Sequence, residues 1–305
     1  MVDLTKIMTE KRNERTMNLD SMSPLEIITI MNDEDERAVL AVKEVLPQIA
    51  TAIQWTTQSL RDGGRLIYMG AGTSGRLGVL DAVECRPTFG VSPDVIIGIM
   101  AGGEKAFMKA VEGAEDSKTL GQEDLEKLNL KKNDIVIGIA ASGRTPYVIH
   151  AIRYARKVGA KTVIIACNRN SEMSKEADLS IEPATGPEVL TGSTRLKAGS
   201  AQKMVLNMIS TASMVGIGKV YQNLMVDVMQ SNEKLVTRAQ NIVIAATGCD
   251  KETAKRKIAT ADGSVKLAIT MILMDCSLEQ AKEHLKRSHG HIRQALEENI
   301  NKEES

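Results

Sequence analysis

The chain has 305 residues, of which 43% are hydrophobic and 26% charged, and its 39 basic side chains balance 39 acidic ones. This composition is typical of a globular protein with one large and one smaller domain, and it excludes a disordered chain. Because the net charge is zero and only 2% of the residues are aromatic, the chain lacks the basic field and the stacking platforms that nucleic-acid binding needs. We therefore expect no nucleic-acid partner.

The four cysteines (Cys85, Cys167, Cys249 and Cys276) lie far apart and follow no C-x-x-C spacing, so the sequence indicates neither a zinc site nor a redox pair. Reduced thiols favour a cytoplasmic location. Residues 1–16 are polar and lack the apolar run of a signal peptide, and no stretch approaches the roughly 18 apolar residues of a membrane span. We expect no membrane partner and no metal site.

The first 60 residues predict helices. Ser23-Pro24-Leu25-Glu26 has the pattern of a capping box with proline at the first helical position, and Asn32-Asp33 predicts a break. A second helix is predicted from Glu36 to Leu60, with a kink at Pro47 and a stop at Gly63-Gly64.

Short apolar runs then alternate with amphipathic stretches. The strand candidates are residues 65–70, 95–101, 134–140 and 161–167, with a weaker fifth at 179–181. Because these runs are apolar nearly throughout, they fit strands buried on both faces of a parallel sheet. Helices are predicted at about 75–85, 104–113, 146–158, 171–177 and 200–229. The predicted fold class is α/β, with a doubly wound, parallel five-stranded sheet.

The last 65 or so residues carry no strand signal. Segments 250–259, 264–274 and 277–286 each begin with an Asp or Ser cap and continue with helical apolar spacing. We therefore divide the chain into N-terminal helices (1–60), a sheet domain (61–238) and a small C-terminal all-helical domain (239–305).

The loop after the first strand is rich in glycine and hydroxyl groups. Its sequence, GAGTSGR at 70–76, satisfies the G-x-G-x-x-G dinucleotide pattern. However, Thr73, Ser74 and Arg76 suit a terminal phosphate, whereas dinucleotide loops rely on backbone approach to a pyrophosphate. No acidic residue ends the second strand to hold a ribose; the nearest downstream candidate is Glu104. The sequence therefore argues against NAD.

Two further loops repeat this chemistry. The third strand ends in ASGRTP at 141–146, and TGSTRLK at 191–197 precedes the long helix. Ligands of open parallel sheets bind at the carboxyl ends of the strands, where backbone N–H groups, hydroxyls and guanidinium groups suit a phosphate monoester. The predicted phosphate-binding residues are Gly72, Thr73, Ser74, Gly75, Arg76, Ser142, Gly143, Arg144, Thr145, Ser193, Thr194, Arg195 and Lys197.

These loops resemble the sugar isomerase (SIS) phosphosugar-binding domain. The motifs TEKRNERT, MNDED, GAGTSGRLGVLDAVEC, GGEKAFMKAVEGAEDS, GIAASGRTPYV and TGSTRLKAGSAQKMVLN together resemble the N-acetylmuramic acid 6-phosphate etherase family from about Thr9 to Leu235. The helical tail resembles that family's small C-terminal domain. The resemblance implies a homodimer that cleaves the D-lactyl ether at C3 of the phosphosugar, giving N-acetylglucosamine 6-phosphate and D-lactate, in cell-wall amino-sugar catabolism.

Elimination explains how such an ether is cleaved. In the open-chain sugar the C1 aldehyde acidifies the C2 proton, lactate leaves from C3, and water then adds, so neither a metal nor an organic cofactor is required. On sequence alone, several carboxylates compete for the role of base: Glu104, Glu112, Glu115 and Asp116. The resemblance selects Glu84 and Glu115 as the catalytic pair. We assign Glu84 as the acid that protonates the ether oxygen and later activates water, and Glu115 as the base at C2.

Two alternatives remain at this stage. A non-catalytic phosphosugar sensor, as in the glucokinase regulatory protein, and an aldose-ketose isomerase would use the same phosphate loops. Both Glu84 and Glu115 are present, which favours the enzyme. Release of lactate distinguishes the etherase from both alternatives, and formation of a ketose phosphate distinguishes the isomerase from the sensor.

Overall fold

The computed structural model describes residues 7–109, 111–230 and 232–303. It divides into two compact units. Unit 1 comprises the described residues of 1–83 and 93–210, and unit 2 those of 84–92 and 211–305. The division falls within two helices, α3 (Gly72–Phe89) and α7 (Lys197–Gly216).

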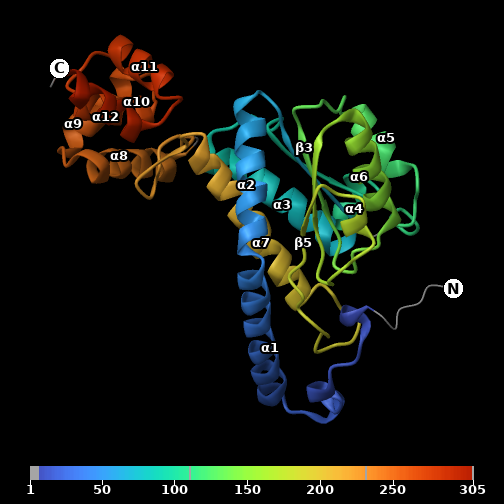
Figure 1. Cartoon of the computed structure of the whole chain (residues 1–305). Helices are drawn as coiled ribbons and strands as arrows, with labels where there is room; N and C mark the ends of the chain where they lie inside the picture. The colour runs from blue at the N-terminus through green and yellow to red at the C-terminus, as the bar shows by residue number, and fades with distance from the viewer. Residues whose placement is uncertain (1–6, 110, 231, 304–305) are drawn as a thin grey trace. The chain divides into compact units, whose positions relative to one another are not determined.

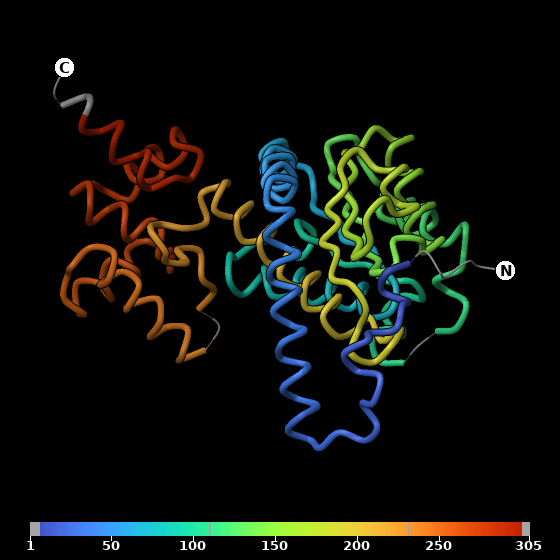
Figure 2. The backbone as a smooth tube through the Cα atoms, turned by 60° about the horizontal axis from the view of Figure 1, so that its bottom comes forward, coloured from blue at the N-terminus to red at the C-terminus, as the bar shows by residue number. Residues whose placement is uncertain are grey.

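Unit 1 begins with three short 3₁₀ turns (Met8–Glu10, Glu14–Thr16 and Leu19–Ser21), followed by α1 (Pro24–Glu44) and α2 (Leu46–Arg61). The predicted capping box is present, because the Ser23 hydroxyl accepts the Glu26 N–H and the Glu26 carboxylate accepts the Ser23 N–H. Figures 1 and 2 show the chain descending through the turns to the foot of α1 and then rising along α1 and α2.

The predicted break at Asn32-Asp33 is wrong. Helix α1 runs through both residues and ends at Glu44, and Val45 separates it from α2. The weak helix propensity of Asn and Asp is overridden by packing, since Ala38, Ala41 and Val42 on the following turns are buried. The interruption lies at Val45, two residues before Pro47, because proline donates no backbone hydrogen bond and restricts the residue before it.

All five predicted strands are present, and the predicted α/β class is confirmed. They are β1 (Leu66–Gly70), β2 (Ile96–Met100), β3 (Ile135–Ile139), β4 (Lys161–Ile165) and β5 (Leu179–Ile181). All pairings are parallel, in the order β2-β1-β3-β4-β5. The order reverses between β1 and β3, so the loops after these two strands flank a crevice of the kind that binds ligands in α/β sheets.

Helices cover both faces of the sheet (Figure 1). On β1, Ile67 and Met69 join the core that includes α6 (Pro146–Val158) and α5 (Leu120–Lys127). Tyr68 points to the opposite face, where a Cβ at Gly78 of α3 would lie only 2.9 Å from the Tyr68 Cβ. Glycine at that position therefore lets α3 lie close against the sheet.

Several predicted helices are shorter in the structure, and one helix in the described part of unit 1 was not predicted. The 104–113 prediction is reduced to α4 (Lys105–Met108), and the 171–177 prediction to a 3₁₀ turn, Met173–Lys175. Helix α5 has no counterpart among the segments predicted from the sequence. The helix predicted at 200–229 ends at Gly216. Gly218 follows with a φ of 78°, and the N–H groups of Gly218 and Lys219 close α7 by donating to the carbonyls of Val215 and Met214, respectively.

Unit 2 contains an antiparallel hairpin, β6 (Val220–Tyr221) with β7 (Leu224–Met225), and five helices in its described part. These are α8 (Glu233–Thr247), α9 (Lys251–Thr260), α10 (Val265–Leu273), α11 (Leu278–Arg287) and α12 (Ile292–Glu303), which share one apolar core. The predicted caps Asp250, Ser264 and Ser277 all accept the expected backbone N–H. Across the described residues, no helix has the length and apolar character needed to cross a membrane.

Candidate active site

The second and third hydroxyl-rich loops lie together at the carboxyl edge of the sheet. The Cys167 N–H donates to the Ala141 carbonyl at 2.9 Å, and the Cys167 thiol lies 3.6 Å from the Ala198 carbonyl. These three side chains form a small buried cluster. Burial raises the pKa of the Cys167 thiol to about 12, so this cysteine is an unreactive packing residue.

The first loop reaches the same place through the start of α7. A Cβ at Gly199 would lie 3.6 Å from both the Thr73 Cγ2 and the Thr194 carbonyl oxygen. One turn further along, the Ser74 hydroxyl donates to Oε1 of Gln202 at 2.9 Å. The ends of β1 and β3 and the start of α7 therefore form one site within unit 1.

Of the three helix starts at this edge, that of α3 is open to an anion. The N–H groups of Gly72, Thr73 and Ser74 have no acceptor among the described residues. At α6, by contrast, the Tyr147 N–H already donates to the Glu115 carbonyl at 3.0 Å. Free N–H groups at the positive end of a helix dipole bind phosphate well.

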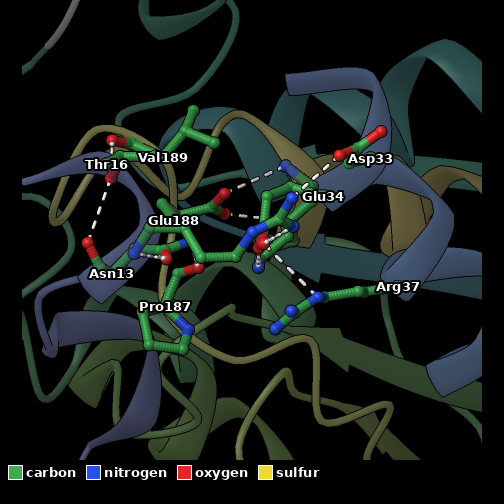
Figure 3. A network of polar contacts seen from close by, with 11 residues as sticks. Asn13, Thr16, Asp33, Glu34, Arg37, Pro187, Glu188 and Val189 are labelled. Atoms are coloured by element: carbon green, nitrogen blue, oxygen red, sulfur yellow. Dashed lines mark hydrogen bonds and ion pairs between the residues drawn. The ribbon is translucent and has the colours of Figure 1, made fainter. Parts of the chain in front are cut away.

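The α7 start is occupied by the protein itself. The carboxylate of Glu188, which is labelled in Figure 3, accepts the N–H groups of Lys197 at 3.2 Å and Ala198 at 3.0 Å. Glu188 is fully buried, and burial raises its pKa above the ordinary value. Both neighbours of Glu188 are fixed by hydrogen bonds from the N-terminal turns. The Asn13 amide donates to the carbonyl of residue 187, and the Thr16 hydroxyl donates to the carbonyl of residue 189. Glu188 was missed in the sequence analysis.

Five of the predicted hydroxyl groups remain available. Each of these side chains is half-buried and makes no hydrogen bond with the described part of the chain. They are Thr73, Ser142, Thr145, Ser193 and Thr194.

Gly75 and Gly143 have a different role in these loops. A Cβ at Gly75 would lie 2.6 Å from the Met100 Cβ, and a Cβ at Gly143 would lie 2.3 Å from the Ser171 Cβ. These glycines allow the loops to pack closely.

Most of the predicted cations are already paired with protein groups. The Arg76 guanidinium donates to the carbonyls of Phe107 at 2.7 Å and Ala106 at 2.8 Å, which ties α4 to α3. Arg144 lies 4.0 Å from the Glu172 carboxylate, and Arg195 is exposed. Hydroxyl and N–H groups, together with the exposed Arg195, are therefore the groups that this site leaves free for an anion.

Lys197, at the start of α7, is part of a buried ionic network around Glu34, which is labelled in Figure 3. Its ammonium group donates to the Glu34 carboxylate, and each residue is only 1% exposed. Glu34 also accepts from Arg15 at 2.9 Å and lies 3.3 Å from Arg37. Burial opposes ionisation of Glu34, but these cations outweigh it and hold its pKa below the ordinary value. The MNDED motif thus fixes the third loop.

Two of the competing carboxylates line a pocket next to the first loop. This pocket has a volume of about 240 Å³, and its lining includes Gly72, Arg76, Glu112 and Glu115. The hydrogen bond from Tyr147 to the Glu115 carbonyl fastens this segment to the start of α6. Glu104 and Asp116 are not among the lining residues. The pocket thus brings Glu115 and Glu112 next to the open start of α3.

Glu84 is not among the residues that line this pocket. It lies on α3, twelve residues after Gly72, which corresponds to about 18 Å along the helix axis. Its side chain is exposed, and its carbonyl accepts the Thr88 hydroxyl at 2.8 Å. No cluster of three or more potential metal ligands occurs within the described ranges.

Comparison with known proteins first gives the class. Residues 48–156 match the glucokinase regulatory protein N-terminal SIS domain, and residues 118–212 match the SIS domain. The sheet and its loops are thus those of a SIS-domain protein. Among solved structures, a phosphoheptose isomerase from Francisella tularensis has a TM-score of 0.49 and 15% identity, over 63% of this chain and 98% of that chain.

Curated relatives then give the particular family. The chain is 59% identical to an N-acetylmuramic acid 6-phosphate etherase of Exiguobacterium sp., over 96% of this chain and all of that protein. It is 58% identical to the proteins of the same name from Geobacillus sp. and Listeria welshimeri, over 96% of this chain and 100% and 99% of theirs. The chain belongs to the N-acetylmuramic acid 6-phosphate etherase family.

Proposed function

We propose that the chain is a carbon-oxygen lyase that converts N-acetylmuramic acid 6-phosphate and water into N-acetylglucosamine 6-phosphate and D-lactate. Its full-length identity to curated etherases supports this activity. The structural observation that carries it is the open start of α3 beside a pocket lined by Glu115. One side of this site suits a phosphate and the other a base.

The 6-phosphate binds at the start of α3. Three free N–H groups and the positive end of the helix dipole offset its charge. The half-buried hydroxyls of the three loops, such as Thr73, Ser142 and Thr194, supply further hydrogen bonds. This arrangement needs no unpaired lysine or arginine, in agreement with the pairing of Arg76 and Lys197 inside the protein.

The reaction proceeds by elimination followed by hydration. Glu115 removes the C2 proton of the open-chain aldehyde, the C2–H electrons form the C2–C3 double bond, and the C3–O bond to lactate breaks. Glu84 gives its proton to the departing oxygen. Glu84 then takes a proton from water as that water adds to C3, and the protonated Glu115 returns a proton to C2, which restores both carboxyl groups to their starting states. The aldehyde conjugated with the double bond accepts the electrons throughout.

A homodimer accounts for the position of Glu84. This residue is exposed on α3, about 18 Å along the helix from Gly72, and does not line the pocket. We place Glu84 of one subunit at the pocket of the other, which makes the dimer the active form. The four cysteines are free thiols, which supports a reducing, cytoplasmic location, where the enzyme acts in cell-wall amino-sugar catabolism.

A coupled assay tests the activity. Purified protein with N-acetylmuramic acid 6-phosphate is expected to release D-lactate, measured with D-lactate dehydrogenase, and an equal amount of N-acetylglucosamine 6-phosphate. An aldose-ketose isomerase would form a ketose phosphate and no lactate. A phosphosugar sensor would bind the sugar without changing it. Either of these outcomes rejects the proposal.

A further inference from the structure

A buried glutamine next to the first loop has one half of its amide without a partner. Gln202 of α7 is fully buried, and its Oε1 accepts the Ser74 hydroxyl at 2.9 Å. Its Nε2 has no acceptor among the described residues. A buried donor without an acceptor carries an energetic cost, and native structures retain few of them.

A half-turn of this amide changes what Ser74 can do. Rotation about the Cγ–Cδ bond exchanges the positions of Oε1 and Nε2, so that Nε2 then lies at hydrogen-bond distance from the Ser74 oxygen. Ser74 accepts that bond, and its own proton becomes free to donate elsewhere. Without an outside acceptor the turned orientation leaves the Ser74 proton as well as Oε1 unpaired, so it is the less stable of the two. An acceptor offered to Ser74 therefore decides between them.

Ser74 lies in the first turn of α3, where the proposed function places the substrate phosphate, and the phosphate oxygens are such acceptors. We propose that Gln202 is a positioning residue: when the 6-phosphate binds at this helix start, the Gln202 amide turns, Nε2 donates to Ser74, and Ser74 donates to a phosphate oxygen. This inference rests on the proposed function, which places the phosphate there. It identifies a residue of the site that acts through Ser74 and does not touch the substrate.

The relay favours an anionic substrate. A phosphate oxygen only accepts, so it requires Ser74 to donate, and Ser74 donates outward only after Gln202 has turned. Hydrogen bonds in a buried chain also polarise one another, which strengthens the bond to the phosphate. The 6-hydroxyl of an unphosphorylated sugar donates to Ser74 without the turn and gains nothing from it.

The experiment is a double-mutant cycle on the Michaelis constant. Gln202→Met keeps the unbranched shape but removes the hydrogen bonds, and it is combined with Ser74→Ala. KM and kcat for N-acetylmuramic acid 6-phosphate are measured for each enzyme, with the melting temperature as a control for folding. Ser74→Ala is expected to raise KM roughly 10- to 100-fold, as for loss of a hydrogen bond to a charged group. We expect Gln202→Met to raise KM roughly 3- to 10-fold with kcat nearly unchanged. The double variant should match Ser74→Ala.

A second variant, Gln202→Glu, gives a pH-dependent KM, which a change in packing alone would not produce. The carboxylate of Gln202→Glu can only accept, so it holds the Ser74 proton and should raise KM above that of Gln202→Met. At lower pH this buried carboxyl group is protonated and can donate to Ser74, so the KM ratio of Gln202→Glu to Gln202→Met should fall. A ratio that is independent of pH would contradict the relay.

The outcomes separate this inference from the proposed function. A wild-type KM in Gln202→Met, together with a raised KM in Ser74→Ala, overturns the relay and leaves the phosphate site intact. KM increases that multiply in the double variant overturn it as well, because Gln202 would then act independently of Ser74. A wild-type KM in Ser74→Ala overturns the phosphate contact of Ser74 itself, and the relay with it.

Discussion

Replacement of Lys197 tests whether the third loop is held by its buried ion pair. In Lys197→Met, Glu34 keeps Arg15 at 2.9 Å and Arg37 at 3.3 Å but loses the ammonium group that shares its burial. Removal of one partner from a buried pair costs about 3–5 kcal/mol. Because two cations remain, we expect a loss of about 2–3 kcal/mol. At roughly 2–4 °C per kcal/mol, the melting temperature should fall by about 4–12 °C.

The matched control removes both charges. In the double variant Glu34→Gln/Lys197→Met the Glu34 carboxylate is removed together with its buried ammonium partner, so the melting temperature should lie above that of Lys197→Met alone. Scanning calorimetry at pH 7 checks both values, and the assay of D-lactate release gives KM for each. A Lys197→Met enzyme with wild-type melting temperature and a KM raised more than about 10-fold would refute this reasoning and make Lys197 a direct phosphate ligand.

Four further predictions concern acid stability, backbone packing and the pocket. The pKa of Glu34 is lowered in the folded state, so its contribution to stability is present above its unfolded pKa and is lost as the pH falls through the folded pKa. In Glu34→Gln the melting temperature should therefore fall less steeply with decreasing pH than in the wild type. Gly75→Ala places a Cβ 2.6 Å from the Met100 Cβ and should cost more than about 2 kcal/mol in urea unfolding, whereas Gly199→Ala, at 3.6 Å from its neighbours, should stay within about 0.5 kcal/mol. Arg76→Met should speed hydrogen exchange in residues 105–108, since their carbonyls lose its guanidinium. Glu115→Gln should abolish lactate release, and full activity in that variant would move the role of base to Glu112.

The strands were predictable because each is a short, continuous apolar run, and burial on both faces of a parallel sheet requires that pattern. The end of α7 was predicted too far along the chain. The glycines at 216 and 218 indicate where the helix ends, but the apolar residues beyond them continue the helical spacing. The missed helix α5 is short and mostly polar, and it depends on its packing against α6. Tertiary packing decides such segments.

The location of the site was predictable, but which of its residues bind the ligand and which stabilise the fold was not. Strand ends and hydroxyl-rich loops place a ligand at the carboxyl edge of the sheet whatever the details of packing. The partners of the cations depend on the fold, however. Lys197 pairs with a carboxylate 163 residues away, and Arg76 with carbonyls about 30 residues away, so spacing in the sequence carries no trace of either contact. Glu188 and Gln202 were missed for the same reason.

Isotope labelling tests the elimination mechanism most directly. The enzyme is incubated with N-acetylmuramic acid 6-phosphate in water enriched in deuterium and heavy oxygen, and both products are analysed by mass spectrometry and NMR. Removal of the C2 proton before loss of lactate predicts deuterium at C2 and heavy oxygen at C3 of N-acetylglucosamine 6-phosphate, with unlabelled lactate. Heavy oxygen in the hydroxyl of lactate, with no deuterium at C2 of the sugar, would contradict elimination and would show that water attacks the lactyl carbon instead.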